Sequence, residues 1–145
     1  MTKSAVAIVA SVQKNLRPLG SGTLLAVGDA FFVLSAGHVL RVAKTLDATV
    51  AIGAADCNFV ATVRPWILSG GAEDTDEHDI ALYRLTASEA NRMGGAQFVR
   101  IADVSFEVDL SESFFVVSGF PSMWSLAPGS TGEEPMLSRL LVYGT

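Results

Sequence analysis

One histidine stands at a position where an imidazole could act as a base. His38 follows the apolar run 31–34 (FFVL) and the small residues 35–37 (SAG). The run is typical of a buried strand, and the small residues permit a tight turn or close packing. An imidazole has an unperturbed pKa of about 6.5, so near neutral pH it can take a proton from a hydroxyl nucleophile. We therefore take His38 as a candidate general base.

A carboxylate at the start of a second apolar strand could orient that imidazole. Asp79 directly precedes 80–85 (IALYRL). A carboxylate that binds one ring N–H fixes the imidazole and stabilises the imidazolium that forms. We expect His38 and Asp79 to face one another across the rim of a small barrel, at about 2.6–3.2 Å. Each residue alone is a weak signal, because Asp79 could be a strand-entry cap and His38 a structural residue.

Short β-rich segments, separated by turn residues, would position this pair. Runs and alternations of Val, Ile, Leu and Phe predict strands at about 4–13, 20–27, 31–35, 48–53, 57–65 and 80–85. Two short helices are predicted at 38–46 and 86–93, the second with Thr86 and Glu89 at capping-box spacing. The glycines between the strands, including Gly20, Gly22 and Gly28, indicate turns or close packing. This order predicts an all-β fold built as an antiparallel six-stranded barrel, because closure removes exposed strand edges.

The chain divides into three regions. Residues 1–95 would form the barrel that carries the candidate pair, residues 96–112 a connection, and residues 113–145 the start of a second barrel. In the last region the sequence predicts one apolar strand near 113–119 and a second one between residue 137 and the end of the chain at 145. We therefore expect a truncated second barrel whose exposed apolar strands favour self-association.

The motifs and their order resemble the trypsin-like serine peptidases of the chymotrypsin fold. In that family a glycine-rich strand start precedes a Ser/Thr-Ala-Ala/Gly-His element with the catalytic histidine. An Asp-Ile/Leu-Ala element with the catalytic aspartate follows. Here 20–27 (GSGTLLAV), 35–39 (SAGHV) and 79–82 (DIAL) match these elements in order. Valine after the histidine resembles the disulfide-free bacterial branch, and 115–121 (FVVSGFP) is similar to the strand that opens the second barrel.

The resemblance implies a serine endopeptidase that hydrolyses peptide bonds through an acyl-enzyme without a cofactor. His38 would be the base and Asp79 the carboxylate that orients it. The family's Gly-Asp/Asn-Ser-Gly-Gly element would fall beyond Thr145, so we expect the 145-residue chain alone to be inactive. Ser130 in GSTG lacks the paired glycines of an oxyanion-binding turn, and Ser118 lacks the first glycine of a nucleophile elbow. The alternative is a noncatalytic, peptidase-like module that binds a protein partner.

Composition argues against several other kinds of partner. The net charge is -5 and the basic residues are scattered, which is unlike a nucleic-acid-binding surface. No apolar run approaches the roughly 18 residues that cross a membrane. Cys57 is the only cysteine, which excludes an intrachain disulfide and favours a cytoplasmic location. We read the apolar N-terminus as a strand rather than a signal peptide. The expected partner is a polypeptide substrate or a protein.

The acidic segment 73–79 (EDTDEHD) offers a second chemistry. Asp74, Asp76 and His78 are candidate metal ligands there. Their spacing fits no calcium loop, because an EF-hand needs a longer array with a glycine at its sharp turn. We therefore interpret the segment as a solvated loop and expect no metal site.

Overall fold

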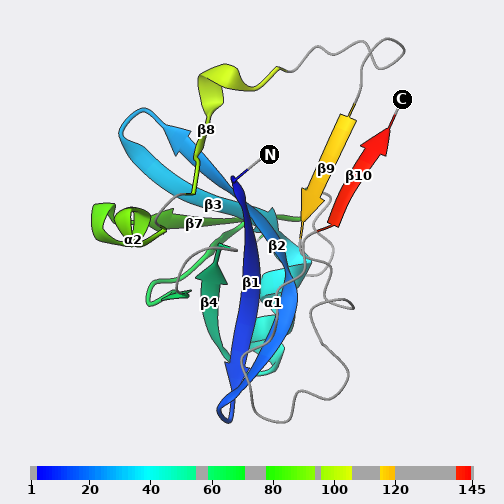
Figure 1. Ribbon diagram of the computed structural model, residues 1–145. Coiled ribbons are helices and arrows are strands. Elements are labelled where there is room, and N and C mark those ends of the chain that lie inside the picture. Colours follow the sequence, from blue (N-terminus) through cyan, green and yellow to red (C-terminus); the bar gives the residue numbers. More distant parts are fainter. Residues whose placement is uncertain are drawn as a thin grey trace.

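A strongly curled antiparallel β-sheet forms the body of the protein (Figure 1). The computed structural model describes residues 3–54, 59–70, 78–93 and 96–105, and the backbone of 115–119 and 140–144. Within these ranges the sheet contains β1 (Ala5–Val12), β2 (Asn15–Val27), β3 (Ala30–Ala36), β4 (Thr49–Gly53), β5 (Val60–Ala61), β6 (Ile67–Leu68), β7 (Ile80–Leu85) and β8 (Val99–Arg100). The helices are α1 (Gly37–Thr45), α2 (Ala87–Arg92) and the 3-10 helix η1 (Ile101–Asp103).

The strands follow the order β5-β4-β1-β2-β3-β7-β6, and β8 pairs in parallel with β2. This arrangement confirms the all-β class and gives a half-barrel. The closed six-stranded barrel is not confirmed, because no described pairing joins β5 to β6. The strand predicted at 57–65 is wrong in its extent, since β5 pairs with β4 while β6, after Pro65, pairs with β7. Pro65 lacks a backbone N–H, which is consistent with the interruption of regular pairing there.

Strand β2 begins five residues earlier than the predicted 20–27 and contains Gly20 and Gly22, for which turns or close packing were expected. A β-bulge separates Ile8, opposite Gly20, from Val9, opposite Pro18. Proline is tolerated at such an irregularity. A Cβ on Gly20 would lie 2.9 Å from Cγ2 of Val39, so this glycine is required for packing rather than for a turn. Gly22 is confined in the same way by β3.

Two further strands lie outside the curled sheet. β9 (Phe115–Gly119) and β10 (Leu140–Gly144) pair with each other as an antiparallel hairpin (Figure 1). This confirms the predicted strand near 113–119 and the one after residue 137. β9 lies beside β1 and β2. The division into regions 1–95, 96–112 and 113–145 stays a prediction.

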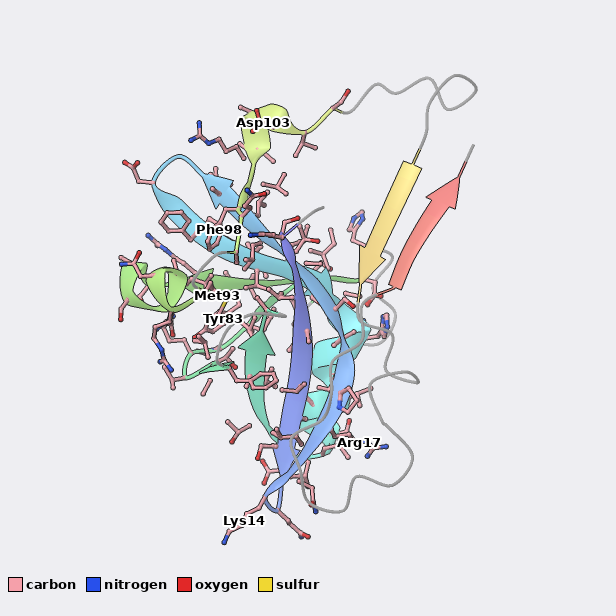
Figure 2. The ribbon with its side chains drawn as sticks, in the orientation of Figure 1. Lys14, Arg17, Tyr83, Met93, Phe98 and Asp103 are labelled. Atoms are coloured by element: carbon pink, nitrogen blue, oxygen red, sulfur yellow. The ribbon has the colours of Figure 1, made fainter. Side chains whose placement is uncertain are left out.

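The inner face of the sheet carries two apolar clusters. The larger one includes Leu24, Tyr83 and Met93, all fully buried, and it lies next to α2 (Figure 2). The other packs Val39 and Leu40 of α1 against the sheet. Every second residue of β1 and β7 points to the same face, and these residues contribute to both clusters. The predicted N-terminal strand is therefore confirmed as β1.

Both predicted helices are present, with ends that agree with the prediction to within one residue. Thr86 and Glu89 form the expected capping box at the start of α2. The Thr86 side chain accepts from the Glu89 N–H at 3.1 Å, and a Glu89 carboxylate oxygen accepts from the Thr86 N–H at 2.7 Å. Among the described residues, no helix has the length and apolar character needed to cross a membrane.

The same carboxylate is the centre of a polar network beside the core. Glu89 accepts a hydrogen bond from the Tyr83 hydroxyl at 3.2 Å and pairs with the guanidinium of Arg64. That guanidinium lies 5.1 Å from the centre of the Tyr83 ring. Burial opposes ionisation of Glu89, but the hydrogen bonds from Thr86 and Arg64 outweigh burial and hold the pKa of Glu89 below its usual value. Burial raises the pKa of Tyr83. Glu89 therefore joins α2, β7 and the segment before β6.

We expect Glu89→Ala to lower the free energy of unfolding by about 2 kcal/mol or more, because it leaves the buried Tyr83 hydroxyl and the N-terminus of α2 without their acceptor. Urea denaturation at neutral pH measures this loss. Ser88→Ala, at an exposed position of the same helix, is the matched control. A loss no larger than that of the control would contradict the network's role.

The β1–β2 turn gives a second prediction. Val12 pairs with Asn15, and the two residues between them, Gln13 and Lys14, have φ values of 48° and 70°. Lys14 lies at the tip of this hairpin (Figure 2). Glycine adopts positive φ without a Cβ clash, so Lys14→Gly should raise the free energy of unfolding by about 0.5–1 kcal/mol. Lys14→Ala removes the same charge but keeps the strain, and an equal gain in that variant would contradict the explanation.

Candidate active site

The register of two neighbouring strands brings the candidate pair together. β3 and β7 are antiparallel, and Ala36 at the end of β3 lies opposite Ile80 at the start of β7. The residues that follow β3 and the residue that precedes β7 therefore meet at the same rim of the sheet. His38 lies in the first turn of α1, and Asp79 directly precedes β7.

The His38 and Asp79 side chains are in direct contact. His38 Nδ1 lies 2.6 Å from Asp79 Oδ2, within the distance range expected from the sequence. The imidazole is 67% exposed and the carboxylate 37% exposed. The pair is therefore fixed by the sheet yet open to solvent. The catalytic role of the two residues stays a prediction.

Asp79 also caps helix α1 from a distant part of the sequence. The residue at the N-cap position, Ala36, has no side chain that can accept a hydrogen bond. The carbonyl oxygen of Asp79 instead accepts from the Gly37 N–H at 2.8 Å, and Oδ1 accepts from the His38 N–H at 2.7 Å. Two of the N–H groups that a helix leaves without internal partners are thus satisfied by one residue. A carboxylate at this end also interacts favourably with the helix dipole.

The backbone of Asp79 has the left-handed conformation, with φ of 47°. Aspartate tolerates this region better than most residues. The conformation allows the carbonyl group and the carboxylate of one residue to act on the same helix end. His38, through its side chain, is the main cause of a lowered pKa of Asp79; partial burial opposes the shift, and the His38 N–H and the positive charge of Arg41 support it.

Arg41 is a member of the site that the sequence reasoning missed. Its Nη2 donates to Asp79 Oδ1 at 2.7 Å, and its side chain is only 12% exposed. Arg41 is three residues after His38 in the predicted helix 38–46, so the two side chains share a helix face. This spacing of three residues was the signal in the sequence that could have placed Arg41 beside His38. A Cβ on Gly37 would lie 3.0 Å from both Arg41 Nη1 and Asp79 Oδ1, which explains why a glycine suits this position.

The other sequence candidates do not extend this site. Cys57, Asp74, Asp76 and Ser130 lie outside the described residues, so the alternative metal ligands in 73–79 are represented only by His78, which is exposed. Within the described part of the chain, no group of three His, Cys, Asp or Glu side chains is placed to hold a metal ion. The side chain of Ser118 is likewise not described.

The two ring nitrogens of His38 have different roles in this geometry. Nδ1 is bound to the carboxylate, so a neutral imidazole that donates from Nδ1 carries its lone pair on Nε2. Because the ring is mostly exposed, Nε2 is accessible to a hydroxyl brought to the rim. The arrangement can therefore accept a proton at Nε2 and stabilise the resulting imidazolium through Asp79.

We expect Asp79→Asn to lower the thermal midpoint at pH 7, because the amide cannot pair as a charge with His38 and Arg41. The folded-state pKa of Asp79 is lowered, so its contribution to stability is fully present above the unfolded-state value of about 3.9 and is lost as the pH falls through the folded-state pKa. The difference between the variant and the wild type should therefore shrink below about pH 4.

Asp47→Asn is a matched control for this experiment. Asp47 is exposed and has nearly the same backbone conformation, with φ of 48°. It should change the midpoint little at any pH. Equal midpoints for Asp79→Asn and the wild type at pH 7 would contradict a stabilising role for the pair.

No protein-family model matches the chain, and no curated protein matches it.

Proposed function

We propose that this chain supplies the histidine–aspartate half of a trypsin-like serine endopeptidase. One observation carries the proposal, namely the 2.6 Å contact between His38 Nδ1 and Asp79 Oδ2 at an exposed rim. This contact leaves Nε2 as the nitrogen that can act as a base. The carboxylate is also held by the His38 N–H at the start of α1, so the imidazole is oriented by a group that is itself fixed.

The strand order supports the same proposal. β5 and β6 are the ends of the sheet path, yet they are consecutive in the chain and joined by residues 62–66. If residues 60–68 act as one bent strand, shared between β4 and β7, the path becomes a ring of six strands. We propose this ring as the first barrel, over residues 1–95. Residues 96–112 would be the connection and 113–145 the start of a second barrel.

In the proposed reaction a serine from outside these 145 residues approaches Nε2 of His38. Its oxygen attacks the carbonyl carbon of a peptide bond while its proton passes to Nε2, and Asp79 stabilises the imidazolium. The tetrahedral intermediate collapses when the same proton moves to the leaving amine nitrogen, which leaves an acyl-enzyme. Water then repeats both steps, releases the carboxylic acid and restores the serine. No cofactor is required for any of these steps.

The proposed partner is a polypeptide substrate, and the proposed compartment is the cytoplasm. The location is supported by the composition alone, because a chain with Cys57 as its single cysteine depends on no internal disulfide. The second barrel would build the specificity pocket, so the proposal assigns the reaction and not the residue preference.

The test uses the full-length protein that carries these residues. We expect it to hydrolyse an unstructured protein substrate and to react with a fluorophosphonate probe. His38→Gln should reduce both rates by at least about a hundredfold, since general base catalysis contributes roughly 10²–10⁴-fold. His78→Gln is the matched control, because it changes the only other histidine, next to Asp79. Equal losses in both variants, or no reaction in the wild type, would contradict the proposal.

The 145-residue chain alone should be inert in the same assays, because it lacks the proposed nucleophile. Probe labelling of this chain that disappears in Ser130→Ala would show that Ser130 is the nucleophile. A full-length protein that has no activity but binds a protein partner through this region would favour the noncatalytic module instead.

A further inference from the structure

We propose that Arg41 is a positioning residue, which fixes Asp79 so that one carboxylate oxygen always faces His38. This inference rests on the proposed function, since it assigns a role in the same reaction. It concerns a residue that does not touch the substrate and acts only through Asp79.

The two oxygens of Asp79 have separate partners. Oδ1 accepts from the His38 N–H and from Arg41 Nη2, both at 2.7 Å. Oδ2 lies 2.6 Å from His38 Nδ1. A carboxylate rotates readily about its terminal bond, so a single contact would not fix it. Two donors on Oδ1 hold that oxygen against the helix and leave Oδ2 directed at the imidazole.

The burial of Arg41 indicates that its contact with Asp79 is part of the packed structure. The Arg41 side chain is 12% exposed, whereas the His38 side chain is 67% exposed. Removing a guanidinium from water is costly unless it meets an anion, so an arginine at this depth is stabilised by its carboxylate partner. The space comes from Gly37, where any Cβ would lie 3.0 Å from both Arg41 Nη1 and Asp79 Oδ1.

The charge of Arg41 also suits the proposed proton transfers. A guanidinium stays protonated at every pH at which imidazole titrates. Held against Oδ1, it keeps Asp79 ionised when an imidazolium forms on His38, so the proton stays on the ring and returns to the leaving group. His38 and Arg41, both from α1, are the charged or titratable side chains in contact with Asp79 among the described residues.

The first experiment is NMR of this chain, which requires no nucleophile. In Arg41→Met the Hδ1 proton of His38 should exchange with water at least about tenfold faster, and the carboxyl titration of Asp79 should move to higher pH. Arg41→Lys should retain part of the Asp79 effect, because it keeps the charge but not the forked donors. Lys44→Met, on the same helix, should change neither property.

Thermal denaturation separates these effects from a loss of folding. Gly37→Ala is the second variant, since its Cβ would displace the same contact while Arg41 is kept, and it should accelerate Hδ1 exchange in the same direction. A folded Arg41→Met protein with unchanged Hδ1 exchange and unchanged Asp79 titration would overturn the proposal. If Arg41→Met does not fold, unchanged Hδ1 exchange in folded Gly37→Ala would overturn it instead.

The second experiment uses the full-length protein. Arg41→Met should lower kcat by about tenfold with little change in KM, because it alters proton transfer and not substrate binding. Its effect should be much smaller in an Asp79→Asn background, since Arg41 acts through that residue. An unchanged kcat, or equal effects in both backgrounds, would overturn the role. If the wild type has no activity, the proposed function fails, while the NMR measurements still decide the contact.

Discussion

The hydrogen bonds of a single residue, Asp79, determine how this site is built. Its carbonyl oxygen and Oδ1 complete the first turn of α1, and its Oδ2 holds the imidazole of His38. One residue, Asp79, therefore fixes both the start of the helix and the orientation of the candidate base. Both contacts depend on the register of β7 with β3, because Asp79 precedes one strand and α1 follows the other.

The curled sheet makes that arrangement rigid. Six paired positions between β3 and β7 set the register that places Asp79 beside Gly37. Apolar side chains of α1, including Val39 and Leu40, pack against the same sheet and prevent the helix from moving away from the rim. The polar network around Glu89 fixes the other end of β7 through the capping box of α2. Because β7 is held at both ends, the residue at one end can keep a left-handed backbone conformation.

Much of the fold was readable from the sequence because strong local signals decided it. Apolar runs and alternations predicted β1, β3 and β7, and Thr86 with Glu89 predicted the start of α2. The start of β2 was predicted too late, because Pro18 and the glycines after it lie within the strand, at a β-bulge and at close contacts that only the tertiary structure reveals. The contact between His38 and Asp79 was expected because each residue lies at the end of a strand, and the β3–β7 register in the structure brings those ends together. Arg41 could not be assigned in the same way, because an arginine on a short amphipathic helix is ordinarily a surface residue.

The tautomer of His38 tests the central claim most directly, and ¹⁵N NMR of this chain measures it. At a pH where the ring is neutral, the account predicts that the proton resides on Nδ1, donated to Asp79, and that Nε2 carries the lone pair. Asp79→Asn should abolish this preference. A wild-type neutral ring with its proton on Nε2 would leave no base facing the nucleophile and would contradict the account.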